Sequence, residues 1–542
     1  MAKKKILLSL FLLMAGIVST AAKPPRLVIN LVVGTMQADD IDRYQGQFTE
    51  EGFLRLKKGG ADFTGASYDY QQTVAPVSLA TLTTGSMPST HGVIATRWRD
   101  YITNEAVGLI EDRKVRDAEY QNGNGAYSPR NLIAPTLGES LLRQSPESRV
   151  VTLALDPYSA IVMGGREGWT FWMDPITCNW STSTYYMRIL PAWVKKFNAE
   201  KLYISYTADP WHTLLKQEQY LNKRRSDIIM TTGSERGKGS RTTNDQIRRI
   251  SSIAPYKTAY ESLLYSPAGN LMTFEFAKTA MTQLELGKRN TTDMLNICLD
   301  APRAVNEAYG PESIETEDMY YRLDRDLAEF LTFVYSQVKP EEVLIVLTAA
   351  HGTSPSYDFG REEADRLNPR QFEVILNSFL SARYGQGDWV LEYENKCIYL
   401  NHNLVYEKEL SLADIQNEVA IFAMQFRGVS HALSATAMRT SYFGSGYARK
   451  MQNSFYPRRS GDVIINLMPG WIEEHPTKRS SAGSMYGYDT RVPLIFYGTG
   501  VTPRHVARAV DMIHVAPTEA YLIGIGAPDA AEGMVLEEII SK

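Results

Sequence analysis

Cysteine is scarce in this chain of 542 residues, which contains three: Cys178, Cys298 and Cys397. Their wide spacing excludes both the framework of a disulfide-rich domain and the paired cysteines of a zinc knuckle. One disulfide would be compatible with an oxidising compartment. We expect buried free thiols instead, because free cysteine is among the residue types most often buried.

The sequence also lacks a strong charge and long apolar runs. The formal net charge is -4, which excludes a broad basic surface and therefore nucleic acid as a partner. After residue 22 no stretch is long and apolar enough to span a membrane. Hydrophobic residues make up 44% of the chain and charged residues 22%, which is typical of a globular protein. The length suits a large α/β core with insertions.

The N-terminus has the pattern of an export signal. Lys3, Lys4 and Lys5 precede an apolar stretch at 6–18, and the small residues at 19–22 suit cleavage near Ala22. A membrane anchor is the alternative, but the apolar stretch is short for a span. The sequence therefore predicts a signal peptide at 1–22 and a mature domain at 23–542, periplasmic or secreted, with no transmembrane anchor after cleavage.

Apolar runs of strand length alternate with segments of helical pattern, such as 269–286 and 318–335. Runs of this kind predict buried parallel strands, and the alternation predicts an α/β sandwich with a mostly parallel sheet. Two irregular stretches, about 166–266 and about 368–480, are interpreted as insertions over the carboxyl edge of the sheet, where ligands bind in such folds. The predicted strands are 26–33, 149–155, 294–299, 343–348 and 493–497.

Several characteristic segments follow one another along most of the mature chain. They are 27–36 (LVINLVVGTM), 73–76 (TVAP), 84–92 (TGSMPSTHG), 128–132 (SPRNL), 180–187 (WSTSTYYM), 308–311 (AYGP), 348–352 (TAAHG) and 488–498 (YDTRVPLIFYG). Together they resemble the alkaline phosphatase superfamily. The nearest match is its periplasmic, phosphate-irrepressible branch, which is similar to the type I phosphodiesterases and nucleotide pyrophosphatases. The resemblance implies a three-layer α/β sandwich with a mostly parallel central sheet and two insertions over the active-site edge.

The resemblance also implies a mechanism. In that family Asp and His side chains at strand ends hold two zinc ions, which clamp the attacking and leaving oxygens of phosphoryl transfer. A Thr or Ser hydroxyl at a helix start attacks phosphorus, and the metal makes that weak nucleophile reactive.

Most of the positions that match those functional residues have lost the required side chain. The position of the nucleophile, directly before Ala-Pro, is Val74, and only His351 keeps the residue type of a metal ligand. We therefore expect neither a catalytic residue nor a bound metal or other cofactor. The former metal-ligand positions are Gly34, Arg303, Glu307, Ala350, His351 and Ala482.

Positions that contact the substrate in that branch have changed as well. A Lys-x-Arg pair after the second core strand aligns with Asp156 and Tyr158, and an Asn aligns with Thr96. The loss of cations that stabilise developing charge would be costly even with zinc present.

Residues near these positions could in principle restore a site. Thr73 is one residue from the nucleophile position and would face another direction, so we interpret it and Ser78 as capping or packing hydroxyls. Asp300 could join His351 as a ligand, but the fixed cation of Arg303 argues against a metal there. We expect Arg303 and Glu307 to form an i, i+4 ion pair that fills the former metal pocket.

The sequence therefore predicts a pseudophosphatase that acts by binding or scaffolding, with an unknown protein or envelope partner. One alternative is a metal-dependent phosphate- or sulfate-ester hydrolase with a rebuilt site, and another is a metal-free anion sensor that uses Arg303. His351 is interpreted as a hydrogen-bonded core residue. The aromatic segments 171–172 and 180–186 would be either a binding face or packing against the core.

Overall fold

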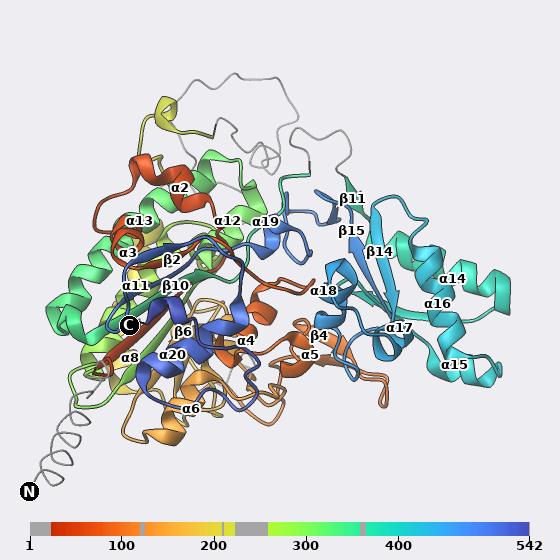
Figure 1. Cartoon of the computed structure of the whole chain (residues 1–542), viewed down its shortest axis with the longest axis horizontal. Coiled ribbons are helices and arrows are strands. Elements are labelled where there is room, and N and C mark those ends of the chain that lie inside the picture. Colours follow the sequence, from red (N-terminus) through yellow and green to blue (C-terminus); the bar gives the residue numbers. More distant parts are fainter. Residues whose placement is uncertain (1–22, 120–124, 209–210, 223–257, 358–364, 541–542) are drawn as a thin grey trace, which may run out of the picture.

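The computed structural model describes residues 23–119, 125–208, 211–222, 258–357 and 365–540. The predicted signal peptide at 1–22 lies outside the described residues. Figure 1 shows a large lobe built around a long sheet and a small lobe, here defined as residues 365–474, beside it. Among the described residues, no helix has the length and apolar character needed to cross a bilayer.

A nine-stranded sheet forms the centre of the large lobe, in the order β18-β2-β17-β10-β1-β9-β6-β7-β8. The five central strands from β10 to β7 run parallel, which confirms the predicted mostly parallel sheet. The strands are β1 (Leu27–Val33), β2 (Ala61–Phe63), β6 (Val150–Ala154), β7 (Trp169–Met173), β8 (Trp180–Ser181), β9 (Asp293–Leu299), β10 (Val343–Ala349), β17 (Leu494–Gly498) and β18 (Arg504–Val506).

One predicted parallel strand runs the other way. β17, predicted at 493–497, is antiparallel to β10 and to β2. Its apolar run fits a strand buried on both faces in either direction, so the pattern could not reveal the orientation.

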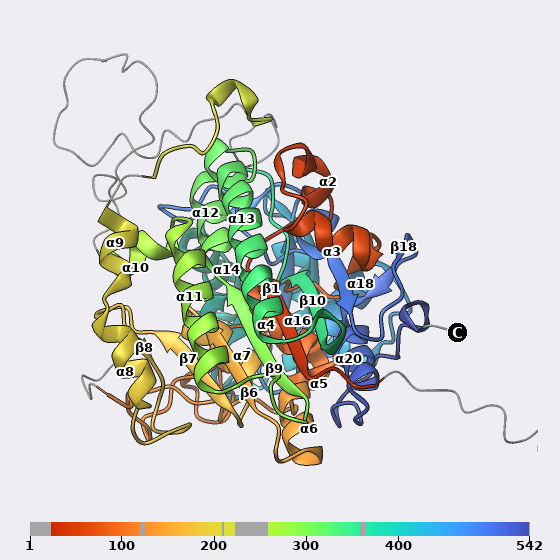
Figure 2. The ribbon, with the colours of Figure 1, turned by 90° about the vertical axis from the view of Figure 1, so that its left-hand side faces the viewer.

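Helices cover both faces of this sheet and complete three layers (Figure 2). α11 (Ala268–Gln283) and α13 (Ile314–Gln337) lie together on one face, where the rings of Phe274 and Phe330 stack at a centroid distance of 4.8 Å. On the other face lie α4 (Ala75–Thr84), α7 (Pro157–Gly164) and α20 (Val515–Ile523).

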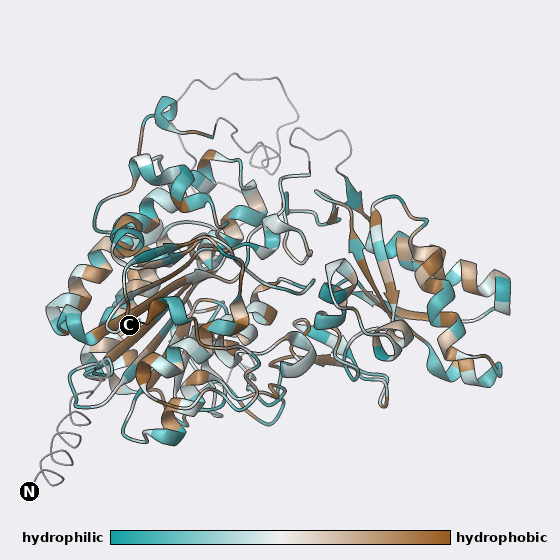
Figure 3. Cartoon of the chain, viewed as in Figure 1, coloured by the Kyte–Doolittle hydropathy of each residue, from teal (hydrophilic) through white to brown (hydrophobic). Residues whose placement is uncertain are grey.

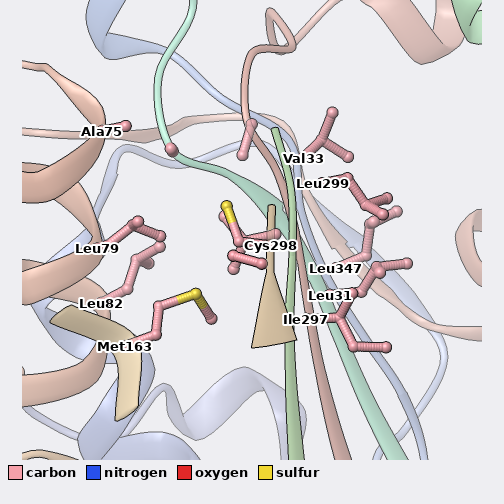
Figure 4. Packing of buried hydrophobic residues seen from close by; sticks show 14 of the residues in the cluster. Leu31, Val33, Ala75, Leu79, Leu82, Met163, Ile297, Cys298, Leu299 and Leu347 are labelled. Atoms are coloured by element: carbon pink, nitrogen blue, oxygen red, sulfur yellow. The ribbon is translucent and has the colours of Figure 1, made fainter. Parts of the chain in front are cut away.

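Successive side chains along each strand of the sheet point alternately toward one helical layer and the other. Figure 4 shows Leu79 and Leu82 of α4 and Met163 of α7 facing Cys298 of the sheet, while Leu31 points to the other side. The central strands are the most apolar part of the ribbon in Figure 3, as expected for strands covered on both faces.

The small lobe corrects the prediction that 368–480 is irregular. It contains a four-stranded sheet in the order β12-β13-β15-β14 and its own apolar core, which includes Phe372 and Trp389. Its elements are β11 (Arg366–Leu367), α14 (Pro369–Tyr384), β12 (Val390–Glu394), β13 (Cys397–Leu400), α15 (His402–Glu407), α16 (Leu412–Ala423), β14 (Val429–Ser434), α17 (Ala435–Thr440), α18 (Gly446–Ser454), β15 (Val463–Leu467) and β16 (Ile472–Glu473).

The other predicted insertion, 166–266, also needs a correction, because β7 and β8 within it belong to the main sheet. Three of its aromatic side chains, Phe171, Trp172 and Trp180, are each at most 1% exposed, whereas Tyr185 is 38% exposed. Trp180 stacks on Phe276 with ring centroids 4.2 Å apart. Phe171, Trp172 and Trp180 therefore pack in the core and are not available as a binding face. The three cysteines are buried free thiols, as predicted.

A buried carboxyl group lies between α20 and the sheet. Glu519 is 3% exposed, and its Oε2 and the Oδ1 of Asn30 have no hydrogen-bond partner among the described residues. Both side chains line a small cavity of about 20 Å³. Burial raises the pKa of Glu519 to about 8, against an opposing hydrogen bond from Asn30.

This raised pKa predicts a pH-dependent loss of stability. The stability contributed by protonated Glu519 is fully present below the ordinary pKa of 4.5 and is lost as pH rises through the folded-state pKa of about 8. Glu519→Gln cannot ionise, so its free energy of unfolding should exceed that of the wild type by on the order of 3 kcal/mol at pH 8. Urea unfolding at pH 5 and pH 8 measures this, and an equal difference at both pH values would contradict it.

Candidate functional site

A cavity of about 370 Å³ lies at the carboxyl ends of the central strands, and residues of both lobes line it. The register of the parallel strands brings these ends together: Val33 of β1 pairs with Leu299 of β9 and Ala349 of β10. The residues that follow the strands therefore meet at one edge, as predicted. The cavity is lined by Thr96, Asp156, Tyr158, Arg303, Glu307, His351 and Ala482 among the predicted positions, and by Lys396, Glu473 and Lys478 among others.

Two former ligand positions, Gly34 and Ala350, lie deep in the protein at this edge. A Cβ placed on Gly34 would lie 2.8 Å from the carbonyl oxygen of Leu299 and 3.1 Å from the Cβ of Arg303. Ala350 is fully buried, and its N–H donates to the carbonyl of Val33. The space for a side chain at Gly34 has therefore been taken by the start of the helix that carries Arg303.

The nucleophile position, Val74, is the N-cap residue of α4 and forms no side-chain cap. The neighbouring hydroxyls are occupied by packing: Thr73 Oγ1 donates to the carbonyl of Ser484 at 2.9 Å, and Ser78 accepts from Tyr70. Both are fully buried. Neither hydroxyl lines the cavity, as the capping-or-packing interpretation expects.

Arg303, on α12 (Ala301–Tyr309), binds two carboxylates. Its Nη2 lies 2.8 Å from Oδ2 of Asp156 and 3.7 Å from Oδ1 of Asp300. Asp300 also accepts hydrogen bonds from the N–H of Asp156 and the hydroxyl of Ser159. Burial and the charge of Asp156 raise the pKa of Asp300 to about 6, although Arg303 opposes them. Arg303 is thus the cation that offsets the negative charges of Asp156 and Asp300.

The predicted ion pair between Arg303 and Glu307 is wrong. Glu307 pairs with Lys478 at 2.9 Å, while Arg303 turns to the two aspartates. Burial raises the pKa of Glu307, but Lys478 and then Arg303 outweigh it, so the pKa lies below its ordinary value. The i, i+4 spacing predicted that Arg303 and Glu307 would pair with each other. Instead, each pairs with a residue from a distant segment of the chain: Arg303 with Asp156, and Glu307 with Lys478.

His351 is 2% exposed, and its Nδ1 lies 2.6 Å from the carbonyl oxygen of Gly352 and 3.4 Å from the Thr35 hydroxyl. Burial lowers the pKa of His351 to about 4, so the ring is neutral at neutral pH. This arrangement is what the interpretation as a hydrogen-bonded core residue expects.

At two of the former substrate-contact positions, Asp156 and Tyr158, the side chain forms hydrogen bonds within the protein. Asp156 caps α7 by accepting from the N–H of Tyr158, and the Tyr158 hydroxyl donates to Glu111 at 2.5 Å. The backbone carbonyl of Thr96 accepts from Leu109. Asp156 and Tyr158 are thus hydrogen-bonded within the protein, whereas the partly exposed Thr96 lines the cavity.

The chain matches the family model of type I phosphodiesterases and nucleotide pyrophosphatases over residues 28–489. It belongs to this family. It is 29% identical over 538 residues to the alkaline phosphatase PafA of Elizabethkingia meningoseptica, covering 98% of this chain and 97% of the relative. It is 28% identical over 523 residues to the alkaline phosphatase PhoV of Synechococcus elongatus, covering 95% and 93%.

The fold agrees with this assignment. The crystal structure of wild-type PafA is similar with a TM-score of 0.87 and 27% identity, covering 96% of this chain and 100% of that chain. The chain is therefore a member of the alkaline phosphatase superfamily, as its motifs predict, with the mixed α/β architecture of that superfamily.

The residues of this member do not fit the zinc pair that the family resemblance implies. No group of three His, Cys, Asp or Glu side chains that could hold a metal ion occurs in the part of the chain that the structure describes. Asp156 and Glu307 are already neutralised by Arg303 and Lys478. Two fixed cations beside these carboxylates would repel a divalent ion.

Sequence reasoning missed two lysines of the cavity, Lys396 and Lys478. Lys396 follows Asn395 between two short strand-like runs, a signal for a two-residue hairpin, but that signal does not show where the hairpin points. Both lysines come from the region of 368–480 that was predicted to be irregular.

Proposed function

We propose that this chain is an exported pseudophosphatase that binds a ligand or partner through its former active-site cavity without metal and without phosphoryl transfer. The observation that carries the proposal is the place of Arg303, which is held between Asp156 and Asp300 where the family resemblance implies metal ligands. The Arg303 guanidinium stays charged at all accessible pH values, so it offsets the negative charge of these carboxylates at every such pH.

The other parts of the phosphoryl-transfer machinery are absent from their expected places. Val74 has no hydroxyl to attack phosphorus, and Gly34 leaves no room for a carboxylate ligand. Efficient catalysis would need both a reactive nucleophile and stabilisation of the transition-state charge. The cavity has a volume of about 370 Å³, which suits a binding role for an envelope partner or small molecule.

Export is supported by the basic and apolar N-terminal pattern at 1–22.

The competing function is a phosphate- or sulfate-ester hydrolase with a rebuilt metal site. The test is turnover of p-nitrophenyl phosphate and p-nitrophenyl sulfate by the mature chain, with zinc and after chelation. Turnover at the buffer background under both conditions is expected. Turnover that chelation or His351→Ala abolishes would contradict the proposal, because it would require a metal bound through that imidazole.

A further inference from the structure

Three polar side chains form a hydrogen-bonded ladder across the centre of the large sheet. Asn30 of β1 pairs in register with Asn296 of β9, and Asn296 pairs with Thr152 of β6. Asn30 Nδ2 donates to Asn296 Oδ1, and Asn296 Nδ2 donates to Thr152 Oγ1, each at 3.0 Å. Because the amide of Asn30 donates along this ladder, its Oδ1 is left at the end, where no described residue donates to it.

Glu519 of α20 meets the end of the ladder. It lines the cavity of about 20 Å³ together with Asn30, and its Oε2 has no hydrogen-bond partner among the described residues. Burial raises the pKa of Glu519 to about 8, so the carboxyl is mostly protonated at neutral pH. A protonated carboxyl carries a hydrogen that needs an acceptor, and the amide oxygen of Asn30 needs a donor.

Much of the cavity wall is apolar. The wall includes Leu82 of α4 and Met163 of α7, which face the sheet in Figure 4. Buried polar atoms without a hydrogen bond are rare in native proteins, because they have lost contact with water and gained nothing in return. Cavities that stay empty are apolar, whereas polar cavities hold water once they offer about 10–15 Å³. This cavity meets both conditions for one water molecule.

Two hydroxyl groups add further acceptors to the cavity. Thr83 and Thr348 line it as well. Thr83 Oγ1 donates to the carbonyl of Leu79 at 2.9 Å, and Thr348 Oγ1 donates to the carbonyl of Pro493 at 2.8 Å. Each hydroxyl has therefore used its only hydrogen and can now accept. A water molecule matches this set, because it can accept from the carboxyl and donate to two acceptors.

We propose that one water molecule is bound in this cavity, where it accepts a hydrogen bond from the carboxyl of Glu519 and donates one to Oδ1 of Asn30. The water joins α20 to the polar ladder of the sheet. A calcium ion would need about six to eight oxygen ligands, but the cavity offers a single carboxyl group. No described residue lines both this cavity and the former active-site cavity, so the inference is independent of the proposed function.

The test is a set of crystal structures of the mature chain at pH 6, for the wild type, Glu519→Gln and Glu519→Met. Glutamine keeps a hydrogen-bond donor at the place of the protonated carboxyl, whereas methionine has a similar length and no donor. The wild type and Glu519→Gln should each show one solvent peak about 2.7–3.0 Å from Oδ1 of Asn30 and from the polar end of residue 519. Glu519→Met should lose this peak.

A measurement in solution complements the crystal structures. Oxygen-17 magnetic relaxation dispersion counts water molecules that stay in a protein for long times. Glu519→Gln should hold as many as the wild type, and Glu519→Met should hold one fewer. The comparison of the wild type with Glu519→Gln decides the inference even if Glu519→Met does not fold, because both must contain the water.

Four results would overturn the inference. The first is a wild-type cavity without a solvent peak, and the second is a direct hydrogen bond from Glu519 to Oδ1 of Asn30 that closes the cavity. The third is a peak of equal strength in Glu519→Met, which would show that the carboxyl does not hold the water. The fourth is an anomalous signal in the cavity after sodium and potassium are replaced by rubidium, which would reveal a monovalent cation.

Discussion

The mature chain is expected to hydrolyse p-nitrophenyl phosphate at least about 10⁵-fold more slowly than PafA assayed beside it with zinc. The expected loss is large because the nucleophile and the groups that stabilise charge are missing together. Val74 offers no oxygen to phosphorus, and the cavity carboxylates are bound by Arg303 and Lys478. Nucleophile activation and stabilisation of the transition state each contribute orders of magnitude in rate.

Val74→Thr provides the matched variant for this expectation. It restores a hydroxyl at the N-cap of α4, where Thr is also a better cap than Val. The variant should be at least as stable as the wild type, yet its rate of hydrolysis should stay at background, because nothing activates the hydroxyl. A wild-type rate within 100-fold of PafA, or a rate restored by this one substitution, would show that a working metal site remains.

Arg303→Met is expected to lower the free energy of unfolding by about 3 kcal/mol, since removing one partner of a buried ion pair leaves the other charge uncompensated. Asp300 has no exposed side-chain area, and Asp156 is about one quarter exposed. Methionine keeps much of the arginine stem, so the loss reports mainly on charge. Urea unfolding at pH 7 measures the difference.

The double variant Arg303→Met with Asp300→Asn tests the cause. It removes the buried charge that the single variant leaves behind, so it should recover at least about 1 kcal/mol. Arg143→Met is the surface control, because Arg143 and Asp529 form an exposed pair and its loss should leave stability nearly unchanged. An unchanged stability in Arg303→Met would mean that Arg303 does not stabilise this corner.

The fold and the lost functional positions could be predicted because both depend on local patterns. Apolar runs located β1, β6, β9 and β10 within one or two residues, and the residue after each run falls at the same sheet edge. The direction of β17 could not be predicted, because an apolar run buried on both faces has the same composition in either direction.

The partners of the charged residues could not be predicted, because they come from distant segments. Asp156 lies 147 positions from Arg303 in the sequence. Local helical spacing favoured Glu307 as the partner, but the start of α7 placed Asp156 closer. The place of Lys396 in the cavity could not be predicted for the same reason. The sequence indicates its turn, but the closeness of Lys396 to Val74 depends on how the small lobe packs against the large lobe.

The central claim is that the protein's own cations have replaced metal at the former active site. The most direct test is the zinc content of the mature chain from Lys23 onward, measured by elemental analysis after purification without chelators, with PafA purified in parallel. The account predicts near-zero zinc per chain, even after zinc is offered and the excess is removed. One or two tightly held zinc ions per chain would contradict it and would reveal a rebuilt metal site.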